Sequence, residues 1–395
     1  MISSINRALK IKDKLVEIRR KIHKYPEIGL EEFRTADLVA KYLSKLGLEV
    51  TKGIANTGVV AVIKGVGKGP TIALRADMDA LPIQEQNNHS YVSLVKGKMH
   101  ACGHDGHTAI LLGVAKLLTV KRRSFKGKVK LIFQPAEEIA AGALPMIKQG
   151  VLINPKVDMM FGLHIAPTNG EVGQISLATG AITASTKYFK LRINGFGGHG
   201  AHPHKSVDAI IAAAHVITAL QTIASREINS LLPIVISIGT IHGGYRHNVI
   251  ADEVEMTGTI RTLDEDIRVS IDNKIERIVS GICNSLRCSY ELEIKQGLPS
   301  LINNNKATAI VKKVAEQLLG ENNVFLMAHP SMGGDDFSYF SERVPCCYFR
   351  LHAGNKNKLC TYPLHHPKFN FDEDCLPYGV ALLTDITLTA LKEFG

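Results

Sequence analysis

The chain has 395 residues, of which 45% are hydrophobic and 21% charged. This length exceeds the size at which one hydrophobic core stops growing, so we expect two domains. The net charge is +10, but Lys and Arg are dispersed and Trp is absent, which argues against a nucleic-acid-binding protein. No apolar run reaches about 18 residues, so a membrane-spanning helix is not expected.

The N-terminal segment lacks the apolar centre of a secretory signal. Seven cysteines, an odd number, are scattered along the chain and do not suggest a disulfide framework. We therefore expect a cytoplasmic protein with no nucleic-acid or membrane partner.

Apolar periodicity predicts helices over 5–24 and 31–46, followed by short strands over 59–65 and 71–82. A loop with Cys102 and His104 then leads into an apolar helix over 109–118, for which Asp105 is a candidate N-cap. Strands over 128–138 and 157–165 follow, with a helical stretch between them. This alternation predicts an α/β fold with a mixed, largely parallel sheet.

The pattern changes from about residue 181, where the order becomes strand, helix, two strands, helix, strand. That order is typical of the ferredoxin-like split βαβ arrangement, an α+β fold. The segment over 297–395 again combines helices with a buried strand, as the first part of the chain does. We therefore predict a catalytic domain over 1–180 and 297–395, interrupted by an inserted domain over 181–296.

Polar side chains follow several strands of the predicted sheet. In parallel sheets the functional site lies beyond the carboxyl ends of the strands. Each of these residues alone could be a loop side chain or a buried histidine, but together they indicate a metal site. The candidates at this edge are Asp77, Asp79, Cys102, His104, Glu137, Glu138 and His164.

A mixed set of sulfur, nitrogen and oxygen ligands emerges from these segments: Cys102, His104, Glu138, His164 and either His365 or His366. Five ligands suit two metal ions about 3.5–4 Å apart that share a water. Zn²⁺, Mn²⁺, Co²⁺ or Ni²⁺ would fit, because a thiolate argues against Ca²⁺ and Mg²⁺. Glu137, beside a ligand, is placed to act as the general base.

Eight motifs occur in an order that resembles the M20 metallopeptidase family, over nearly the whole chain: RADMDALP, MHACGHDGHTA, FQPAEE, GLH, GGHGAHPH, RHNVIADEVEMTGTIRT, GGDDF and LHHP. The chain is most similar to the amidohydrolase branch, which includes hippurate hydrolases, N-acyl-amino-acid amidohydrolases and auxin-conjugate hydrolases. The resemblance implies a di-zinc exopeptidase-like fold with helices on both faces of the sheet. It also implies two divalent metals, hydrolysis of the linear amide bond of N-acyl amino acids, and a lid that often dimerises.

The resemblance also implies roles for single residues. Cys102 would bridge the two metals, and the remaining ligands would be His104, Glu138, His164 and His365. His365 is favoured over His366 because the family motif reads Leu-His-x-Pro. Glu137 would be the general base, and Asp79 would steady a ligand from behind the metals.

In the inserted domain, His199 matches a residue that reaches an active site across the dimer and polarises the scissile carbonyl. Asn248 and Arg261 match residues that hold the substrate carboxylate, a task that suits the forked guanidinium of Arg. The proteins that this chain resembles usually have a Glu at the position of Asp335. This departure puts any direct role of Asp335 in doubt.

Other functions are compatible with the same residues. A dipeptidase or an N-carbamoyl amino-acid hydrolase could use this scaffold, with the choice made by the shape of the pocket. A homologue that only binds a ligand would keep the fold, although the complete ligand set and Glu137 speak against it. A zinc finger does not fit, because no second Cys/His pair has the required spacing.

Overall fold

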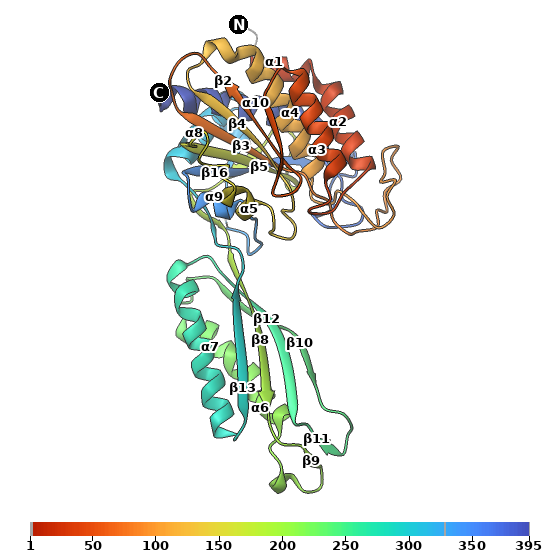
Figure 1. Ribbon diagram of the computed structural model, residues 1–395, viewed down its shortest axis with the longest axis vertical. Coiled ribbons are helices and arrows are strands. Elements are labelled where there is room, and N and C mark those ends of the chain that lie inside the picture. The colour runs from red at the N-terminus through yellow and green to blue at the C-terminus, as the bar shows by residue number, and fades with distance from the viewer. Residues whose placement is uncertain (1–2, 328, 395) are drawn as a thin grey trace. The chain divides into compact units, whose positions relative to one another are not determined.

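The computed structural model describes residues 3–327 and 329–394, which form two compact units (Figure 1). The first comprises Met1–Gly180, Ile302–His329 and Asp335–Gly395, and the second comprises Ala181–Leu301 and Pro330–Gly334. The second unit is therefore inserted into the first. It extends beyond residue 296, the end predicted from the sequence, and it includes a short segment from the C-terminal part of the chain.

The first unit contains an eight-stranded sheet in the order β1-β2-β4-β3-β5-β16-β6-β15. Its strands are β1 (Val50–Ile54), β2 (Gly58–Lys64), β3 (Thr71–Asp77), β4 (Lys128–Gln134), β5 (Met159–Glu171), β6 (Ile175–Leu177), β15 (Val324–Leu326) and β16 (Cys346–Gly354). The central pairs β4–β3, β3–β5 and β5–β16 are parallel, whereas β1–β2, β2–β4 and β16–β6 are antiparallel. The sheet is thus mixed with a parallel centre.

Helices cover both faces of this sheet. They are α1 (Ser4–Leu9), α2 (Lys12–Lys24), α3 (Phe33–Lys45), α4 (His104–Lys121), α5 (Ala143–Lys148), α8 (Asn305–Leu319), α9 (Ser338–Ser341) and α10 (Leu376–Glu393). Helices α4 and α10 contact each other and β3 and β5 on one face, while α5 and α9 contact each other on the opposite face (Figure 1). The predicted α/β fold with a largely parallel sheet is confirmed.

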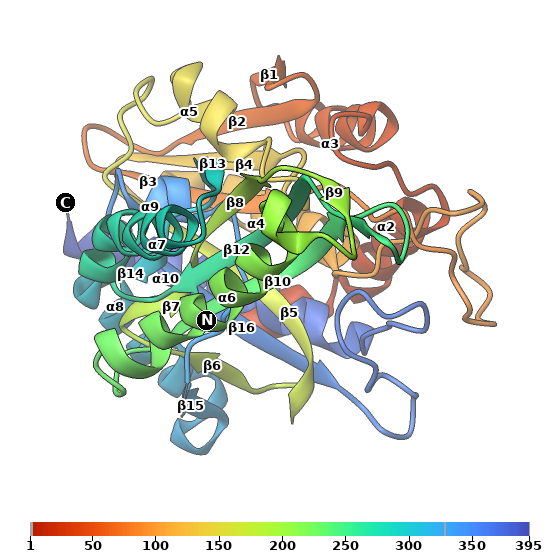
Figure 2. The same cartoon turned by 90° about the horizontal axis from the view of Figure 1, so that it is seen from below.

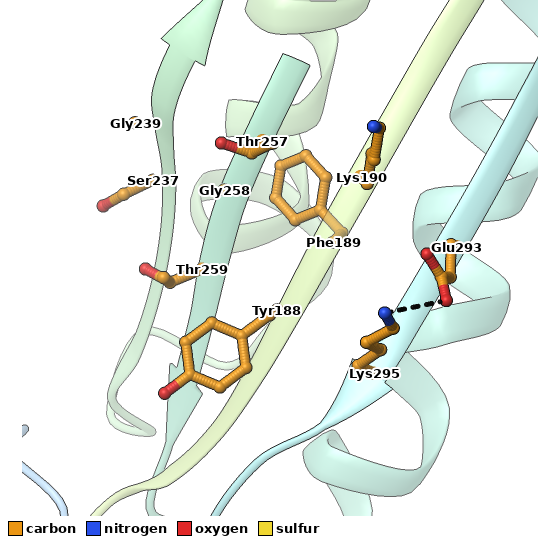
Figure 3. Close-up of a pocket in the computed structure, with 10 residues that line it drawn as sticks. All are labelled: Tyr188, Phe189, Lys190, Ser237, Gly239, Thr257, Gly258, Thr259, Glu293 and Lys295. Carbon is orange, nitrogen blue, oxygen red and sulfur yellow. Dashed lines mark ion pairs between the residues drawn. The ribbon is translucent and has the colours of Figure 1, made fainter. Parts of the chain in front are cut away.

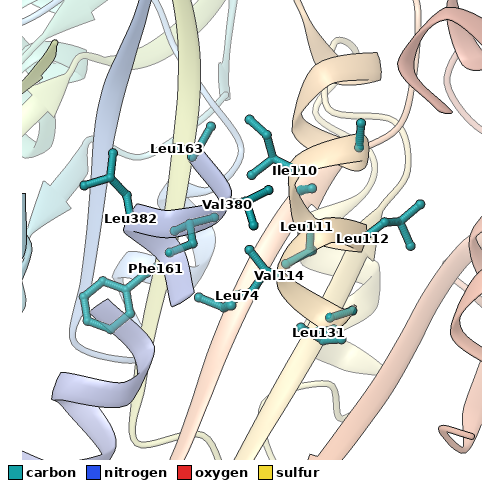
Figure 4. Close-up of a cluster of buried hydrophobic side chains, with 14 of the residues drawn as sticks. Leu74, Ile110, Leu111, Leu112, Val114, Leu131, Phe161, Leu163, Val380 and Leu382 are labelled. Atoms are coloured by element: carbon teal, nitrogen blue, oxygen red, sulfur yellow. The ribbon is translucent and has the colours of Figure 1, made fainter. Parts of the chain in front are cut away.

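The core of the first unit lies between α4, α10 and the central strands (Figure 4). Leu74 of β3, Leu131 of β4 and Phe161 of β5 belong to one buried cluster with Ile110 of α4 and Val380 of α10. All five side chains are fully buried. Burial of this kind contributes about 25 cal/mol per Å² of apolar surface, so this packing fixes the strand ends that carry the polar residues.

The second unit has a four-stranded antiparallel sheet in the order β10-β12-β8-β13. Its elements in chain order are β8 (Ser185–Asn194), β9 (Gly198–His199), α6 (Ala209–Thr222), β10 (Ile234–Gly243), β11 (Val249–Ile250), β12 (Glu253–Thr262), α7 (Glu265–Ser285) and β13 (Ser289–Gln296). Short strands β7 (Gly180–Thr183) and β14 (Leu301–Asn303) lie at its two ends in sequence. Because β12 separates β8 from β10, the unit has the predicted split βαβ arrangement.

Helices α6 and α7 lie side by side on one face of this sheet (Figure 2). The other face is open and carries a shallow cavity of about 340 Å³ (Figure 3). Tyr188, Thr257 and Thr259 line it, together with the ion pair of Lys295 and Glu293. The cavity contains none of the predicted metal-binding side chains, so the chemistry lies elsewhere.

Several local predictions are wrong. The strands expected over 71–82 and 128–138 end earlier, at Asp77 and Gln134. The helix expected over 5–24 is two helices, α1 and α2, separated at Lys10 and Ile11. Both pieces pack against α10, so the apolar periodicity continues across a break that it cannot reveal. Strand β1 is not predicted, and β5 continues past His164 to Glu171 instead of ending there.

The expectation of no membrane-spanning helix also needs correction, because one helical stretch of the described chain meets the criteria of length and composition. One helical stretch, Ala209–Glu227, is long and apolar enough for a span, with a mean hydropathy of 1.3. Ala212, Ala213 and Val216 of this stretch are buried against the unit's own sheet. Core helices of globular proteins pass the same test, so the signal is weak.

Candidate metal centre

Strands β3, β4 and β5 bring their polar ends to one edge of the central sheet. The β3–β4 pairing runs to Asp77 opposite Gln134, and the β3–β5 pairing runs to Arg75 opposite Gly162. His164 therefore lies two residues beyond Gly162, the last residue of β5 that pairs with β3. Glu137 and Glu138 follow β4 after a turn in which Ala136 has φ 53°.

The Cys102 loop meets the same edge because the backbone turns at Gly103, which has φ 94°. Helix α4 begins at His104, so Cys102 lies outside the helix and His104 lies in its first turn. The predicted N-cap role of Asp105 is wrong. Asp105 lies inside the first turn, where its carboxylate accepts hydrogen bonds from Arg19 Nε and Gly106 N, at 2.8 and 2.9 Å.

The structure brings together the five residues proposed as ligands. Cys102 Sγ lies 3.4 Å from His164 Nε2, and His365 Nε2 lies 3.4 Å from Glu138 Oε2. His104 Nε2 lies 3.9 Å from Glu138 Oε1. Overlapping groups of these atoms lie within 4.8 Å of one another, which is close enough for neighbouring atoms to share a metal ion.

Two buried polar atoms in this group have no hydrogen-bond partner among the described residues: His104 Nε2 and Glu138 Oε1. A buried polar atom without a partner costs free energy, so such atoms usually have an unseen one. His104 Nδ1 donates to the Asp79 backbone oxygen at 2.9 Å, which leaves the Nε2 lone pair free. His164 has the same arrangement, because its Nδ1 donates to the Ile165 oxygen at 2.8 Å.

Asp79 lies behind the ligands rather than among them. Its carboxylate is 3.2 Å from His104 Nδ1 and accepts a hydrogen bond from the Glu138 backbone N–H at 3.0 Å. A carboxylate behind a ligating imidazole fixes the tautomer and orientation of that ring. Asp79 is therefore placed to position two of the proposed ligands at once.

The electrostatics of the centre also favour a cation. Burial raises the pKa of Glu137, and the nearby carboxylates of Asp335 and Asp336 raise it further. Burial also raises the pKa of Glu138 and, well above the usual range, that of the Cys102 thiol. A divalent metal would stabilise the ionised forms of all three groups. The thiolate, imidazole and carboxylate donors fit Zn²⁺ or a similar transition metal.

The geometry distinguishes the two C-terminal histidines. His365 has φ 64° and points its Nε2 toward Glu138. The ring of His366 instead stacks on Tyr362 with a centroid distance of 4.6 Å, and its Nδ1 accepts a hydrogen bond from Lys368 N. Of the two, only His365 joins the cluster of proposed ligands among the described residues.

The proposed substrate-binding residues of the second unit do not converge within one chain. His199 pairs with Val249 at the β9–β11 end of the unit (Figure 1), and Asn248 lies beside it, since its backbone oxygen accepts from Gly200 N at 2.9 Å. Both side chains are exposed. Arg261 lies on β12, where its Nη1 donates to the Met332 oxygen at 2.8 Å.

Arg261 is remote from His199. It pairs with Thr186 of β8, whereas the β9 end of the unit begins after Asn194, the last residue of that strand. Thr186 and Asn194 are eight residues apart on β8, which corresponds to about 26 Å at roughly 3.3 Å per residue. One copy of the unit therefore does not gather these residues around one substrate.

Sequence reasoning missed a buried charge network behind the centre. Arg75, in the middle of β3, donates to Asp77 Oδ2 at 2.6 Å and to Asp336 Oδ1 at 3.0 Å. Gln134 Nε2 also donates to Asp336 Oδ1, at 2.7 Å. The available signal was an arginine inside an otherwise apolar strand, because buried charges are paired.

Asp335, the position that departs from the family pattern, is also buried. Its Oδ1 accepts a hydrogen bond from Phe337 N at 2.8 Å and lies 3.6 Å from Arg75 Nη2. His107, one turn after His104 in α4, is engaged at both nitrogens. Its Nδ1 lies 2.6 Å from Asp77 Oδ1, and its Nε2 accepts from Ile165 N.

Comparison with known proteins gives a consistent result. The chain is 42% identical to "Thermostable carboxypeptidase 1" of Saccharolobus solfataricus over 378 residues, which cover 95% of this chain and 94% of that one. It is 39% identical to "N-acetyl-L-cysteine deacetylase" of Bacillus subtilis, over 93% of this chain and 85% of that one.

A solved structure is also similar throughout. The Bacillus subtilis YXEP protein, described as a dinuclear metal binding peptidase from the M20 family, superposes with a TM-score of 0.85 at 34% identity, covering 97% of this chain and 99% of that one. The model of "Peptidase family M20/M25/M40" matches residues 73–389. This chain therefore belongs to peptidase family M20/M25/M40, as its motifs predict.

Proposed function

We propose that this protein is a metal-dependent amidohydrolase that cleaves the amide bond of N-acyl amino acids into a carboxylic acid and a free amino acid. The observation that carries the proposal is the convergence of Cys102, His104, Glu138, His164 and His365 beside Glu137. Two bound metals would supply a water activated for attack and would polarise the scissile carbonyl.

Glu137 is the proposed general base. Its carboxylate lies 4.0 Å from His104 Nε2 and is only about one-tenth exposed. Burial and the nearby carboxylates of Asp335 and Asp336 raise the pKa of this carboxyl, whereas bound metals would stabilise its ionised form, which is the form that accepts a proton. Glu137 would take the proton of the attacking water and deliver it to the leaving amine.

The second unit is proposed to bind the substrate. The guanidinium of Arg261 and the amide of Asn248 suit the free carboxylate of an N-acyl amino acid. The separation of His199 and Arg261 within one copy supports a homodimer in which the partner subunit supplies one of them. His199 would then polarise the scissile carbonyl across the dimer.

A second candidate activity is favoured by one observation, the 42% identity to a carboxypeptidase. A peptide substrate of such an enzyme and an N-acyl amino acid share an amide next to a free carboxylate. The residues proposed here would recognise that shared part. The size and polarity of the acyl side would then decide between N-acyl amino acids, hippurate included, and peptides.

Zn²⁺, Mn²⁺, Co²⁺ and Ni²⁺ are the proposed ions, because each accepts thiolate, imidazole and carboxylate together. All seven cysteines in the described chain are buried free thiols. Free thiols of this kind are usual in a reducing compartment, which supports the proposed location in the cytoplasm.

The test is release of free amino acid from N-acetyl, N-benzoyl and N-indoleacetyl amino acids, with dipeptides and N-carbamoyl amino acids as comparison substrates. Protein stripped with a chelator would be reloaded in turn with each of the four ions. We expect release from acylated substrates only after reloading. Two bound metals without release from any substrate would contradict the proposed activity.

A further inference from the structure

A second group of metal-binding side chains lies apart from the five proposed ligands. His23 lies in the last turn of α2, while Glu85 and His89 lie in the long segment between β3 and α4. Their donor atoms lie within 4.8 Å of one another. The mechanism proposed above uses none of the three.

The distances in this group suit a shared ion. Glu85 Oε1 lies 3.2 Å from His23 Nε2 and 3.2 Å from His89 Nε2. Zinc bonds of about 2.0–2.2 Å at tetrahedral angles separate two ligand atoms by roughly 3.3–3.5 Å. The observed spacings are therefore close to those of ligands around one small divalent ion.

The orientation of His89 is better explained by a metal than by a hydrogen bond. Its Nε2 is near Glu85, yet both of its ring nitrogens are buried and make no hydrogen bond among the described residues. The ring stacks on Tyr91 at a centroid distance of 3.7 Å with planes 15° apart. This stacking holds the imidazole in place, and a metal lying between His89 Nε2 and Glu85 Oε1, which are 3.2 Å apart, would bind both atoms.

The surroundings of His23 are typical of a metal ligand. Its Nδ1 lies 2.8 Å from Asp105 Oδ2, so a carboxylate stands behind the imidazole and Nε2 faces Glu85. Asp105 is itself held by Arg19 Nε at 2.8 Å. A carboxylate in this place fixes the tautomer of a ligating histidine and increases its basicity.

The local charges do not exclude a cation. Arg19 and Arg20 bring two positive charges, and both pair with Glu373. Glu85, Asp105 and Glu373 bring three negative charges, which leaves the group with one excess negative charge. The side chains of His23 and Glu85 are fully buried, whereas His89 is 18% exposed, which gives an ion access from solvent.

We propose that His23 Nε2, Glu85 Oε1 and His89 Nε2 form a third metal site, separate from the proposed catalytic pair, for Zn²⁺ or a similar transition ion. Two imidazoles and one carboxylate are a known donor set for such ions, with water completing the coordination. The site would tie the end of α2 to the segment that precedes α4. It goes beyond the proposed hydrolase function and does not depend on it.

The competing occupant is a proton. Burial lowers the pKa of His23, but its contacts with Asp105 and Glu85 outweigh burial and raise that pKa overall. A protonated His23 between two carboxylates would satisfy this side of the cluster. His89 Nε2 would then keep only its 3.2 Å contact with Glu85 Oε1, and its Nδ1 would have no hydrogen bond among the described residues. A metal requires the His89 imidazole as a ligand, whereas the proton does not.

Metal content of the 395-residue chain separates the two possibilities. Stripped wild-type protein and the His89→Ala variant would be reloaded with Co²⁺, freed of excess ion and analysed by mass spectrometry of the metal. We expect His89→Ala to bind one equivalent fewer than the wild type. It should keep the cobalt–thiolate absorption expected at Cys102. His215→Ala, which removes an exposed histidine of the second unit, is the matched control and should bind as the wild type does.

Equal metal content in the wild type and the His89→Ala variant would overturn the proposal. Anomalous X-ray scattering from wild-type crystals grown with Zn²⁺ avoids any dependence on the folding of the variant. A peak between the three donor atoms is expected. Its absence while the Cys102 centre is filled would also overturn the site, and neither result depends on whether the protein hydrolyses an amide.

Discussion

Single side chains in the candidate centre are held by partners that leave one donor atom free. Nδ1 of His104 donates to Asp79, and Nδ1 of His164 donates to the Ile165 carbonyl. The Nε2 atom of each ring therefore remains available to a metal. His107 shows the contrast, because both of its nitrogens are engaged. Among these three histidines, one ring nitrogen left without a carboxylate or backbone partner therefore distinguishes His104 and His164 from His107.

The two C-terminal histidines provide a prediction at this scale. His365→Ala should weaken Zn²⁺ binding by at least about tenfold, because even residues behind a ligand cost 10- to 100-fold. His366→Ala should leave binding near the wild-type value, since that ring stacks on Tyr362. Competition with a chromophoric chelator measures both constants. Equal weakening by both substitutions would contradict the assignment.

A buried ion pair in the first turn of α4 gives a second prediction. Asp105 and Arg19 are both fully buried, 2.8 Å apart. Asp105→Asn leaves the Arg19 charge without this partner and should lower the free energy of unfolding by about 3–5 kcal/mol. Urea unfolding measures the change.

The control is the exposed pair of Lys14 and Glu17 at 2.7 Å. Glu17→Ala should cost less than about 0.5 kcal/mol, because solvent screens such pairs. If Asp105→Asn costs no more than Glu17→Ala, the buried pair is not important for stability.

The residues of the candidate site were partly predictable from the sequence. The motifs made it possible to propose Cys102, His104 and Glu138 together, and the structure brings their donor atoms close. Asp105 was assigned wrongly, because an N-cap and a buried partner of Arg19 have the same residue type and differ only in tertiary contacts. Arg75 and its pairing with Asp336 were missed for the same reason.

At the scale of elements, α4 is the helix around which the first unit is packed. It contacts α2, α3 and α10 as well as β3, β4 and β5. Nearly all of its residues are buried, so its sequence has little amphipathic pattern, and sequence reasoning could identify it only as an apolar run. Helix α7, which has one solvent-exposed face, has the clearer periodicity.

Two glycines inside helices provide a matched test of this difference. A Cβ at Gly113 of α4 would lie 2.6 Å from Val380 Cγ2 and 2.8 Å from Leu15 Cδ2. Gly113→Ala should therefore destabilise the protein by about 1–3 kcal/mol through overpacking. A Cβ at Gly281 of α7 would have no atom within 4 Å, so Gly281→Ala should stabilise its unit by about 0.5–1 kcal/mol.

Thermal unfolding of the two variants measures both effects. A stabilising Gly113→Ala would show that α4 can move away from α10 and α2. That result would contradict the tight packing described for the first unit.

Element boundaries were predictable where the chain supplied a local signal. Strand β3 begins at Thr71, as predicted, but it ends at Asp77, before the end of the predicted segment at residue 82. The break between α1 and α2 and the extra length of β5 were not predictable, because packing on α10 and pairing with β16 decide them. Both are contacts between residues distant in sequence.

At the scale of the whole molecule, the proposed roles of His199 and Arg261 in one active site imply a second copy of the chain. Mixing inactive Glu137→Gln chains with inactive His199→Ala chains should restore activity, because a mixed dimer has one site with both residues intact. With random pairing in a two-fold dimer, about a quarter of wild-type activity is expected.

The measurement is turnover after co-refolding, with the fraction of mixed dimers established by native mass spectrometry. Recovery that follows this fraction supports donation across the dimer. Mixed dimers that remain inactive would show that His199 does not act in the partner's site.

The alternation of strands and helices made the overall architecture predictable, and the change of pattern near residue 181 indicated the insertion. The segment Pro330–Gly334, which belongs to the second unit, was not predictable. Its assignment depends on tertiary contacts such as that of Arg261 with the Met332 carbonyl, for which five residues of sequence contain no signal.

The most direct test of the central claim compares the wild type with Glu137→Gln, measuring metal content and turnover on the same samples. Because Glu137 is proposed to move a proton and not to bind metal, the variant should hold the same amount of metal as the wild type. Its turnover should fall by at least about 10²-fold, the usual contribution of a general base. Wild-type turnover in the variant would contradict the proposed mechanism.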